Sequence, residues 1–189
     1  QPRGASLFIP EEDYGFYSLS ALATIIFCER GLPFLYQGQE IGMSNRRWKY
    51  NEFNDLETIN QYQIALKAGM SKEQALEIAR HHSRDNARTP MQWSSEENAG
   101  FSKGKPWMPV NENYRVVNVA EEEKEYGSIL NFYKRLIAFY KSEEYNEILT
   151  YGDFRPIYEK EDHIFAYSRS YGCQKLVLIC NFSSKEKDI

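Results

Sequence analysis

The stretch Gly31-Leu32-Pro33-Phe34-Leu35-Tyr36-Gln37-Gly38-Gln39-Glu40-Ile41-Gly42-Met43 holds a short apolar run bounded by glycines. Its length and its flanking residues are typical of a buried β-strand, which we expect from Pro33 to Gln37. An amphipathic helix that ends at Gly31 is predicted before it, because apolar side chains recur there at helical spacing. These side chains are Leu19, Leu22, Ala23 and Ile26. A helix that leads into a buried strand indicates an α/β protein.

Three further helices are expected downstream. The first covers residues 57–68 approximately and ends at Gly69, a residue type that favours helix ends. The second opens on Ser71-Lys72-Glu73-Gln74, which has the spacing of a capping box. The third covers residues 128–140, where apolar side chains again repeat with the helical period. Residues 44–82, which include the first two helices, form an insertion after the predicted strand.

Beyond residue 142 the pattern changes to short apolar or alternating segments. They cover residues 147–151, 154–158, 163–168 and 175–182. The turns between them contain Gly152-Asp153, Glu161-Asp162 and Tyr171-Gly172. Short segments of this kind, separated by turn residues, predict an antiparallel meander of strands.

The stretch Ser83-Arg84-Asp85-Asn86-Ala87-Arg88-Thr89-Pro90-Met91-Gln92-Trp93 follows neither the helical nor the strand period. Its polar groups therefore lie in a loop. The residues alone allow two interpretations: a charged surface loop with an internal ion pair, or a site for a polyhydroxylated ligand. A planar guanidinium suits the second, because it donates two parallel hydrogen bonds to neighbouring hydroxyl groups.

The chain resembles α-glucosidases of the α-amylase superfamily, glycoside hydrolase family 13. Within that family it is most similar to the oligo-1,6-glucosidase, dextran glucosidase and trehalose-6-phosphate hydrolase branch. The two stretches quoted above carry the resemblance, together with two others that occur in the family's order. These are Asn98-Ala99-Gly100-Phe101 with Gly104-Lys105-Pro106-Trp107, and Val110-Asn111-Glu112-Asn113-Tyr114 with Val117-Asn118-Val119.

The resemblance implies a division into two regions. Residues 1–142 correspond to the C-terminal portion of a (β/α)8 TIM barrel: its last strand, a loop insertion at about 44–126 and its last helix. Residues 143–189 correspond to the start of an antiparallel C-terminal β-sandwich domain that lacks its closing strands. A complete barrel takes about 250 residues, more than the 189 of this chain. We therefore expect apolar surface to be exposed and the chain to associate when made alone.

The resemblance also implies that the catalytic residues are not in this chain. In the family, the residues that match Gln1-Pro2-Arg3 directly follow an Asn-His-Asp triplet whose aspartate stabilises the transition state. The family's nucleophile and its acid/base glutamate precede that triplet. Catalytic residues are thus expected upstream of Gln1.

Substrate-binding residues are expected in the chain. By resemblance, Arg84 contacts the reacting glucose, Asp85 orients Arg84 or lies beside the sugar, and Glu57 matches a glutamate that touches the next sugar. Glu57 is equally consistent with an ordinary exposed residue in the first turn of a helix. Arg88 is a further candidate, although bracing the loop suits it better, and Trp48 is expected near the outer subsites.

Trp93 and Trp107 could stack on sugar faces, but we expect them to anchor loops in apolar pockets.

Three functions fit these observations. The first is a retaining α-glucosidase that hydrolyses terminal α-1,6 or α-1,4 bonds of isomaltose-type or maltose-type oligosaccharides, through two carboxyl groups about 5 Å apart. The second is a related sucrose isomerase or glucosyl transferase. The third is a non-enzymatic relative, such as the ectodomain of an amino-acid transporter heavy chain. Among hydrolases, trehalose-6-phosphate hydrolase competes with oligo-1,6-glucosidase, because Arg46, Arg47 and Lys49 could meet a sugar phosphate.

Composition excludes other classes of partner. The net charge is −4, from 23 basic and 27 acidic residues, which argues against nucleic acid or an anionic membrane. The longest apolar run, residues 21–28, is too short to span a bilayer. The three histidines show no metal-ligand spacing, and no phosphate-binding glycine loop is present, so we expect no metal or cofactor. Cys28, Cys173 and Cys180 are expected to be buried free thiols, as in a cytoplasmic protein.

Overall fold

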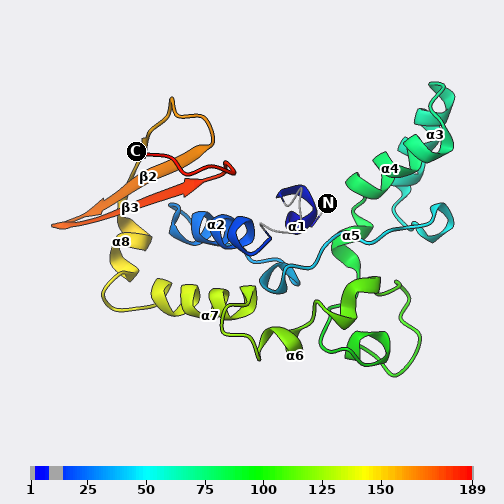
Figure 1. Cartoon of the computed structure of the whole chain (residues 1–189), viewed down its shortest axis with the longest axis horizontal. Helices are drawn as coiled ribbons and strands as arrows, with labels where there is room; N and C mark the ends of the chain where they lie inside the picture. The colour runs from blue at the N-terminus through cyan, green and yellow to red at the C-terminus, as the bar shows by residue number, and fades with distance from the viewer. Residues whose placement is uncertain (1–2, 9–14, 189) are drawn as a thin grey trace.

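A computed structural model describes residues 3–8 and 15–188 of the chain. Its elements form three groups along the long axis of the molecule (Figure 1). Helices α2 (Gly15–Cys28) and α7 (Ile129–Tyr140) lie in the middle. A small sheet with helix α8 lies at one end, and helices α3 to α5 lie at the other.

The central pair of helices is held by an apolar seam. Ala23 and Phe27 of α2 bury their side chains against Ile129, Tyr133 and Leu136 of α7. The Oγ atom of Ser128 accepts a hydrogen bond from the backbone N–H of Asn131 and so caps the start of α7. Both helices agree with the sequence expectation, except that α2 ends three residues before Gly31.

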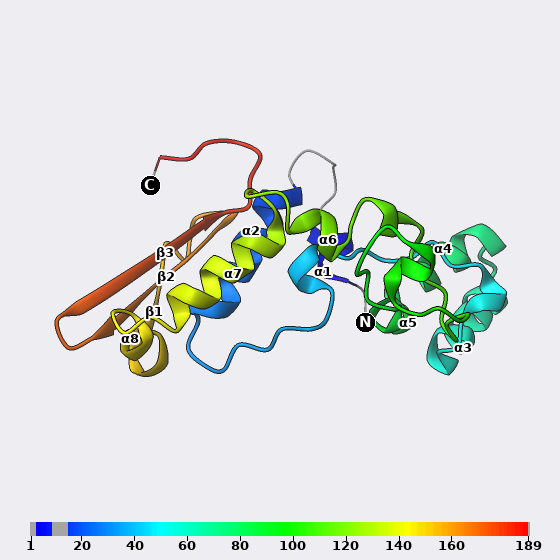
Figure 2. The same ribbon diagram turned by 90° about the horizontal axis from the view of Figure 1, so that it is seen from below.

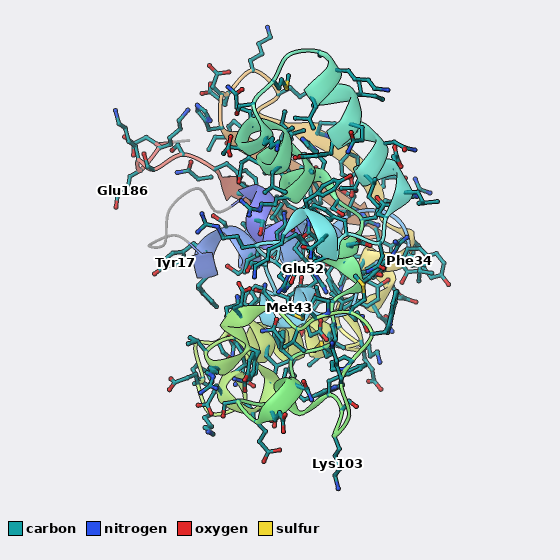
Figure 3. All side chains as sticks on the ribbon, turned by 90° about the vertical axis from the view of Figure 1, so that its right-hand side faces the viewer. Tyr17, Phe34, Met43, Glu52, Lys103 and Glu186 are labelled. Carbon is teal, nitrogen blue, oxygen red and sulfur yellow. The ribbon has the colours of Figure 1, made fainter. Side chains whose placement is uncertain are left out.

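The strand expected from Pro33 to Gln37 does not form. Residues 32–36 are extended but belong to no sheet in the described part of the chain. Leu32 is 73% exposed and Phe34 is 81% exposed. Figure 2 shows this segment running clear of the helices, and in Figure 3 Phe34 points outward. An extended segment becomes a strand only beside a second one, and without one the apolar side chains lie on the surface, as the composition led us to expect.

Helices α3 (Leu56–Lys67) and α4 (Lys72–His82) form where two helices were predicted, and they pack on each other as a hairpin. Ser71 and Gln74 make the reciprocal hydrogen bonds of a capping box at the start of α4. The hairpin closes over a core that includes the fully buried Trp48 and Met108. That core ties the hairpin to loops from two other parts of the chain.

Short elements connect these groups. They are α1 (Gly4–Phe8), η2 (Gln39–Ile41), η3 (Tyr50–Glu52), α5 (Asp85–Arg88), η4 (Glu97–Gly100), η5 (Glu112–Arg115) and α6 (Val119–Glu122).

The C-terminal region contains a three-stranded antiparallel sheet. Strands β1 (Asp153–Ile157), β2 (Ile164–Tyr171) and β3 (Gln174–Asn181) follow one another in space as in sequence, which is the expected meander. The expectation of a strand at 147–151 is wrong, because this segment is helix α8 (Asn146–Tyr151). The neighbouring side chains of Ile148 and Leu149 are both buried. A strand with one buried face cannot bury two successive side chains, whereas a helix can.

Two of the three cysteines match expectation. Cys28 and Cys180 are buried free thiols, and burial raises the pKa of Cys28 to about 11. Cys173, in the turn between β2 and β3, is exposed, which corrects the expectation that it is buried. A two-residue turn at the end of a hairpin leaves its side chains no layer to pack against.

A single buried arginine joins the sheet to the helices. The side chain of Arg169 on β2 is fully buried. It donates hydrogen bonds to the carbonyl oxygens of Cys28 at 2.8 Å, Leu149 at 2.9 Å and Gly152 at 2.9 and 3.1 Å. These carbonyls lie at the C-terminal ends of α2 and α8, where the helix dipole favours a positive charge. Arg169 thereby caps two helices at once.

Replacing Arg169 with Met should destabilise the chain strongly, because it leaves three buried carbonyl groups without donors. We expect a loss of about 3 kcal/mol or more in the free energy of unfolding, measured by urea denaturation. Arg155→Met on strand β1 is the matched control, since Arg155 is exposed. Equal stability of the two variants would contradict this role for Arg169.

Candidate functional site

The first layer of the candidate site is a buried arginine near the start of the chain. Arg3 is 5% exposed, and its guanidinium bonds to the carbonyl oxygens of Gln37, Asn86 at 2.9 Å and Ala87 at 3.3 Å. It also donates to the Oγ1 atom of Thr89 at 3.1 Å. Burial lowers the pKa of Arg3. Arg3 thus fixes the polar 83–93 loop against the end of the 32–37 segment. Gln1 and Pro2, which precede it, lie outside the described residues.

Gly38 makes this arrangement possible. Its backbone has φ +86°, a conformation that favours glycine. A Cβ atom there would lie 2.7 Å from Nη1 of Arg3 and would also collide with the side chain of Met43. The chain therefore turns at Gly38 so that Arg3 passes close to the backbone.

Asn86 organises the interior of the loop. It is fully buried, and its Oδ1 atom accepts hydrogen bonds from Nε1 of Trp48 at 2.7 Å and from the N–H of Arg46 at 3.3 Å. Its Nδ2 atom donates to the carbonyl of Arg80 at 2.7 Å. Trp48 is 0% exposed, so it presents no surface to a ligand here. This geometry gives Trp48 a structural role in the loop, and its expected place near the outer subsites stays a prediction.

Asp85 is likewise turned inward. Its side chain is 0% exposed, and its Oδ2 atom accepts hydrogen bonds from the backbone N–H groups of Asn54 at 2.7 Å and Asp55 at 2.9 Å. Its Oδ1 atom accepts one from Nη1 of Arg88 at 3.1 Å. Asp85 therefore anchors the start of helix α3 and braces Arg88. The expected placement of Asp85 beside a sugar has no support in this geometry.

Arg84 is held by an aspartate that sequence analysis missed. Its Nε and Nη2 atoms donate to Oδ1 of Asp55 at 3.0 and 2.5 Å, and Nη2 lies 3.4 Å from Oε2 of Glu57. Asp55 is 4% exposed. Burial by itself would raise the pKa of Asp55, but the hydrogen bonds from Arg84 and Thr58 outweigh it and lower that pKa to about 2. Asp55 directly precedes a helix, and an aspartate at that position is typical of a helix N-cap. The sequence therefore contained no sign that Asp55 pairs with Arg84.

The two loop arginines face a common cavity. The side chains of Arg84 and Arg88 are 49% and 43% exposed. Both line a cavity of about 490 Å³, together with Arg3, Tyr36 and apolar residues of α2. Met43, labelled near the centre of Figure 3, lines it as well. Arg88 uses only Nη1 in an ion pair within the described residues, whereas Arg84 uses Nε and Nη2. Arg88 therefore keeps more donors for a ligand.

The tryptophans expected to anchor loops are on the surface. Trp93 is 51% exposed and Trp107 is 76% exposed, which corrects that expectation. Within residues 3–8 and 15–188, no group of three or more histidine, cysteine or carboxylate side chains could hold a metal ion. Over those same residues, no helix is long and apolar enough to cross a membrane.

Comparison with known proteins identifies the family. The model of the α-amylase catalytic domain matches residues 1–152. The chain belongs to the α-amylase family. Its sequence is 42% identical to the oligo-1,6-glucosidase of Bacillus cereus over 98% of this chain and 33% of that protein. It is 37% identical to the glucan 1,6-alpha-glucosidase of Streptococcus pneumoniae, over all of this chain and 35% of that protein.

Solved structures of this α-amylase family agree. The chain is similar to trehalose-6-phosphate hydrolase of Bacillus licheniformis, with a TM-score of 0.89 and 40% identity over 98% of this chain and 33% of that one. It is similar to isomaltulose synthase of Erwinia rhapontici, solved with sucrose, with a TM-score of 0.87 and 34% identity over 97% and 33% of the two chains. The chain spans about a third of the length of the relatives it matches.

The ion pair between Arg84 and Asp55 predicts a dependence of stability on pH. An unfolded aspartate has a pKa of about 3.9, and the folded pKa of Asp55 is about 2. Its contribution is complete above pH 4 approximately and is lost as the pH falls through about 2. Because Arg84 is half exposed and screened by solvent, Asp55→Asn should cost at most about 2 kcal/mol of unfolding free energy at pH 7 and much less at pH 2.

Urea denaturation at both pH values tests this, with Asp162→Asn, an exposed aspartate, as the control. A cost for Asp55→Asn that stays the same at pH 7 and pH 2 would contradict the ion-pair origin.

Proposed function

We propose that this chain is part of a retaining α-glucosidase that hydrolyses terminal α-1,6 or α-1,4 glucosidic bonds of short oligosaccharides. The observation that carries the proposal is the cavity into which Arg84 and Arg88 project from one loop. Two guanidinium groups above an apolar wall suit a neutral ring with neighbouring hydroxyl groups. The relatives named oligo-1,6-glucosidase and glucan 1,6-alpha-glucosidase support the α-1,6 linkage as the bond that is hydrolysed.

We propose further that residues 1–142 are the last part of a (β/α)8 barrel and residues 143–189 the start of a β-sandwich domain. In this arrangement residues 33–37 are the eighth strand, and α7 is the last barrel helix. The extended backbone of residues 32–36, with its exposed apolar side chains, supports the first assignment. Its end lies beside the cavity, where a barrel strand carries its binding groups.

Within the cavity, we assign the contact with the reacting glucose to Arg88 rather than to Arg84. Arg88 is fixed by one hydrogen bond to the buried Asp85 and keeps its other N–H groups for a ligand. Arg84 forms an ion pair with Asp55. Its Nη2 atom also lies near the carboxylate of Glu57 at the edge of the site. Glu57 is exposed and is the residue we propose to meet the second sugar.

A trehalose-6-phosphate hydrolase is the nearest competitor, because a relative of that name is structurally similar. A phosphate group would need free basic residues near the site. Arg46 does not qualify, since it is 8% exposed and donates two hydrogen bonds to Glu52. Arg47 and Lys49 are exposed, but neither lines the cavity, so they provide little to bind a phosphate group there. A neutral oligosaccharide therefore fits better. The unpaired buried thiols suit a reducing compartment, and we propose the cytoplasm.

Hydrolysis of p-nitrophenyl α-glucoside tests the function. The carboxylates of Asp55 and Asp85 are engaged by Arg84 and Arg88, so neither is free to attack a sugar. We therefore expect activity in a version extended upstream of Gln1 and none in the 189-residue chain. Activity of the short chain would assign the chemistry to an exposed carboxylate such as Glu57 and overturn this division of roles. No activity in either would refute the glucosidase proposal.

Variants of the two arginines test the binding roles. In the extended protein, Arg88→Ala should lower kcat/KM by about 100-fold, because hydrogen bonds from a charged donor to the reacting ring are lost. Arg84→Ala should lower it by about 10-fold, since that side chain acts mainly through Asp55. Arg115→Ala, an exposed arginine in η5, is the control. A larger loss of kcat/KM for Arg84→Ala than for Arg88→Ala would assign the contact with the reacting glucose to Arg84 instead.

A further inference from the structure

A second cleft lies on the other side of the Asp85 anchor. Its volume is about 460 Å³, and it runs between residues 51–54 and residues 105–110. The backbone N–H of Asn54, a lining residue, donates to Oδ2 of Asp85, the residue that follows Arg84 of the first cavity. The cleft itself contains neither Arg84 nor Arg88.

The cleft is held open by a buried cation. Arg46 donates to both carboxylate oxygens of Glu52 on one wall, at 2.7 and 3.3 Å. Its Nε atom donates to the carbonyl of Val110 on the opposite wall at 3.1 Å. Its guanidinium lies 5.0 Å from the ring centre of the buried Trp48. Both walls are therefore fixed to the same side chain, and the cleft is formed before any ligand arrives.

A rigid loop supplies the rest of the lining. Asn98, Ala99 and Gly100 have positive φ angles of 54°, 60° and 65° in succession. The Nδ2 atom of Asn98 donates to the carbonyls of Ser102 at 3.1 Å and Gly104 at 3.3 Å. The loop that carries Lys103, seen at the lower edge of Figure 3, leads from there to the second wall.

The chemistry of the lining selects a neutral, hydroxyl-rich ligand. Trp107 is 76% exposed and sits between Pro106 and Pro109, which limit the motion of its backbone. Asn51, Asn54 and Asn98 line the cleft together with Trp107. The Nδ2 atoms of Asn54 and Asn98 donate within the protein, so these two amides offer their Oδ1 atoms as acceptors for hydroxyl groups. The hydrogen bond from Arg46 lowers the pKa of Glu52 and neutralises its charge within an ion pair. Lys105 is the one basic residue among the described residues of the lining, which is too little positive charge to bind an anionic polymer.

We propose that this cleft is a second carbohydrate-binding site, in which one face of a glucose unit stacks on Trp107 and its hydroxyl groups bond to the three asparagine amides. The C–H groups on the face of a pyranose ring are apolar and pack against an aromatic ring, while the hydroxyl groups at its edge need polar partners. The site would hold a remote part of a longer α-glucan. The choice of α-glucan rests on the proposed glucosidase function.

Affinity electrophoresis through gels that contain dextran tests the proposal in the protein extended upstream of Gln1. Trp107→Ala should weaken the retardation by dextran about tenfold or more, as expected for loss of a central aromatic contact. Trp93→Ala removes an exposed tryptophan that does not line the cleft, and it should change retardation less than about twofold. Arg115→Ala, at an exposed residue that lines neither cavity, should also leave it within about twofold. Arg88→Ala, at a residue of the other cavity, identifies any retardation that arises there. Thermal unfolding of each variant confirms that it folds.

Three results would overturn the proposal. They are unchanged retardation of Trp107→Ala, no retardation of any protein, and loss of retardation in Arg88→Ala but not in Trp107→Ala. If a proline-rich peptide shifts the NMR signal of the Trp107 indole and isomaltotriose does not, the ligand of the cleft is a peptide and the saccharide proposal is wrong. Hydrolysis of the aryl glucoside is measured separately, so an active enzyme that dextran does not retard would refute the cleft alone.

Discussion

The guanidinium of Arg3 is the interaction on which the candidate site depends. It gathers carbonyl groups from the end of the 32–37 segment and from the polar loop, two parts of the chain that are far apart in sequence. Buried carbonyl groups need donors, and a fully ionised arginine supplies five N–H groups in one plane. With Arg3 in place, Asn86 lies under the loop and both exposed arginines turn toward the cavity. The site is therefore built from loops whose geometry is set by buried hydrogen bonds.

Sequence periodicity predicted the parts of the fold that pack their own apolar faces. Helices α3 and α4 and the meander of β1 to β3 bury a face against a neighbour in the chain, so the local pattern was sufficient. Helix α7 packs on the distant α2, but its strong apolar period was sufficient as well. Periodicity failed for residues 33–37, because an apolar run forms a strand only beside a second strand, and these residues pair with none in the described part of the chain. It also failed at residues 147–151, where a short apolar run is compatible with both helix and strand.

The candidate site was predictable in its location but only partly in its roles. Residues 83–93 were predicted to be a loop, and the structure places the one-turn helix α5 within them. Arg84 and Arg88 of this segment line the cavity, and their contact with a sugar stays a prediction. Which groups face inward was not visible, because Asp85 and Asn86 are buried by contacts with residues about 30 to 40 positions away. The partner of Arg84 is Asp55, which lies 29 positions away in the chain. Such pairings depend on tertiary structure, and a single sequence carries no local signal for them.

Arg169 has a consequence for the order of folding. It lies 141 positions from Cys28, whose carbonyl oxygen it caps. Contacts between such distant positions form late, because the long intervening loop must first be closed. During synthesis, which runs from the N-terminus, the end of α2 therefore stays uncapped until the second strand of the sheet has left the ribosome. The final arrangement of the central helices is thus completed only after strand β2 has been made.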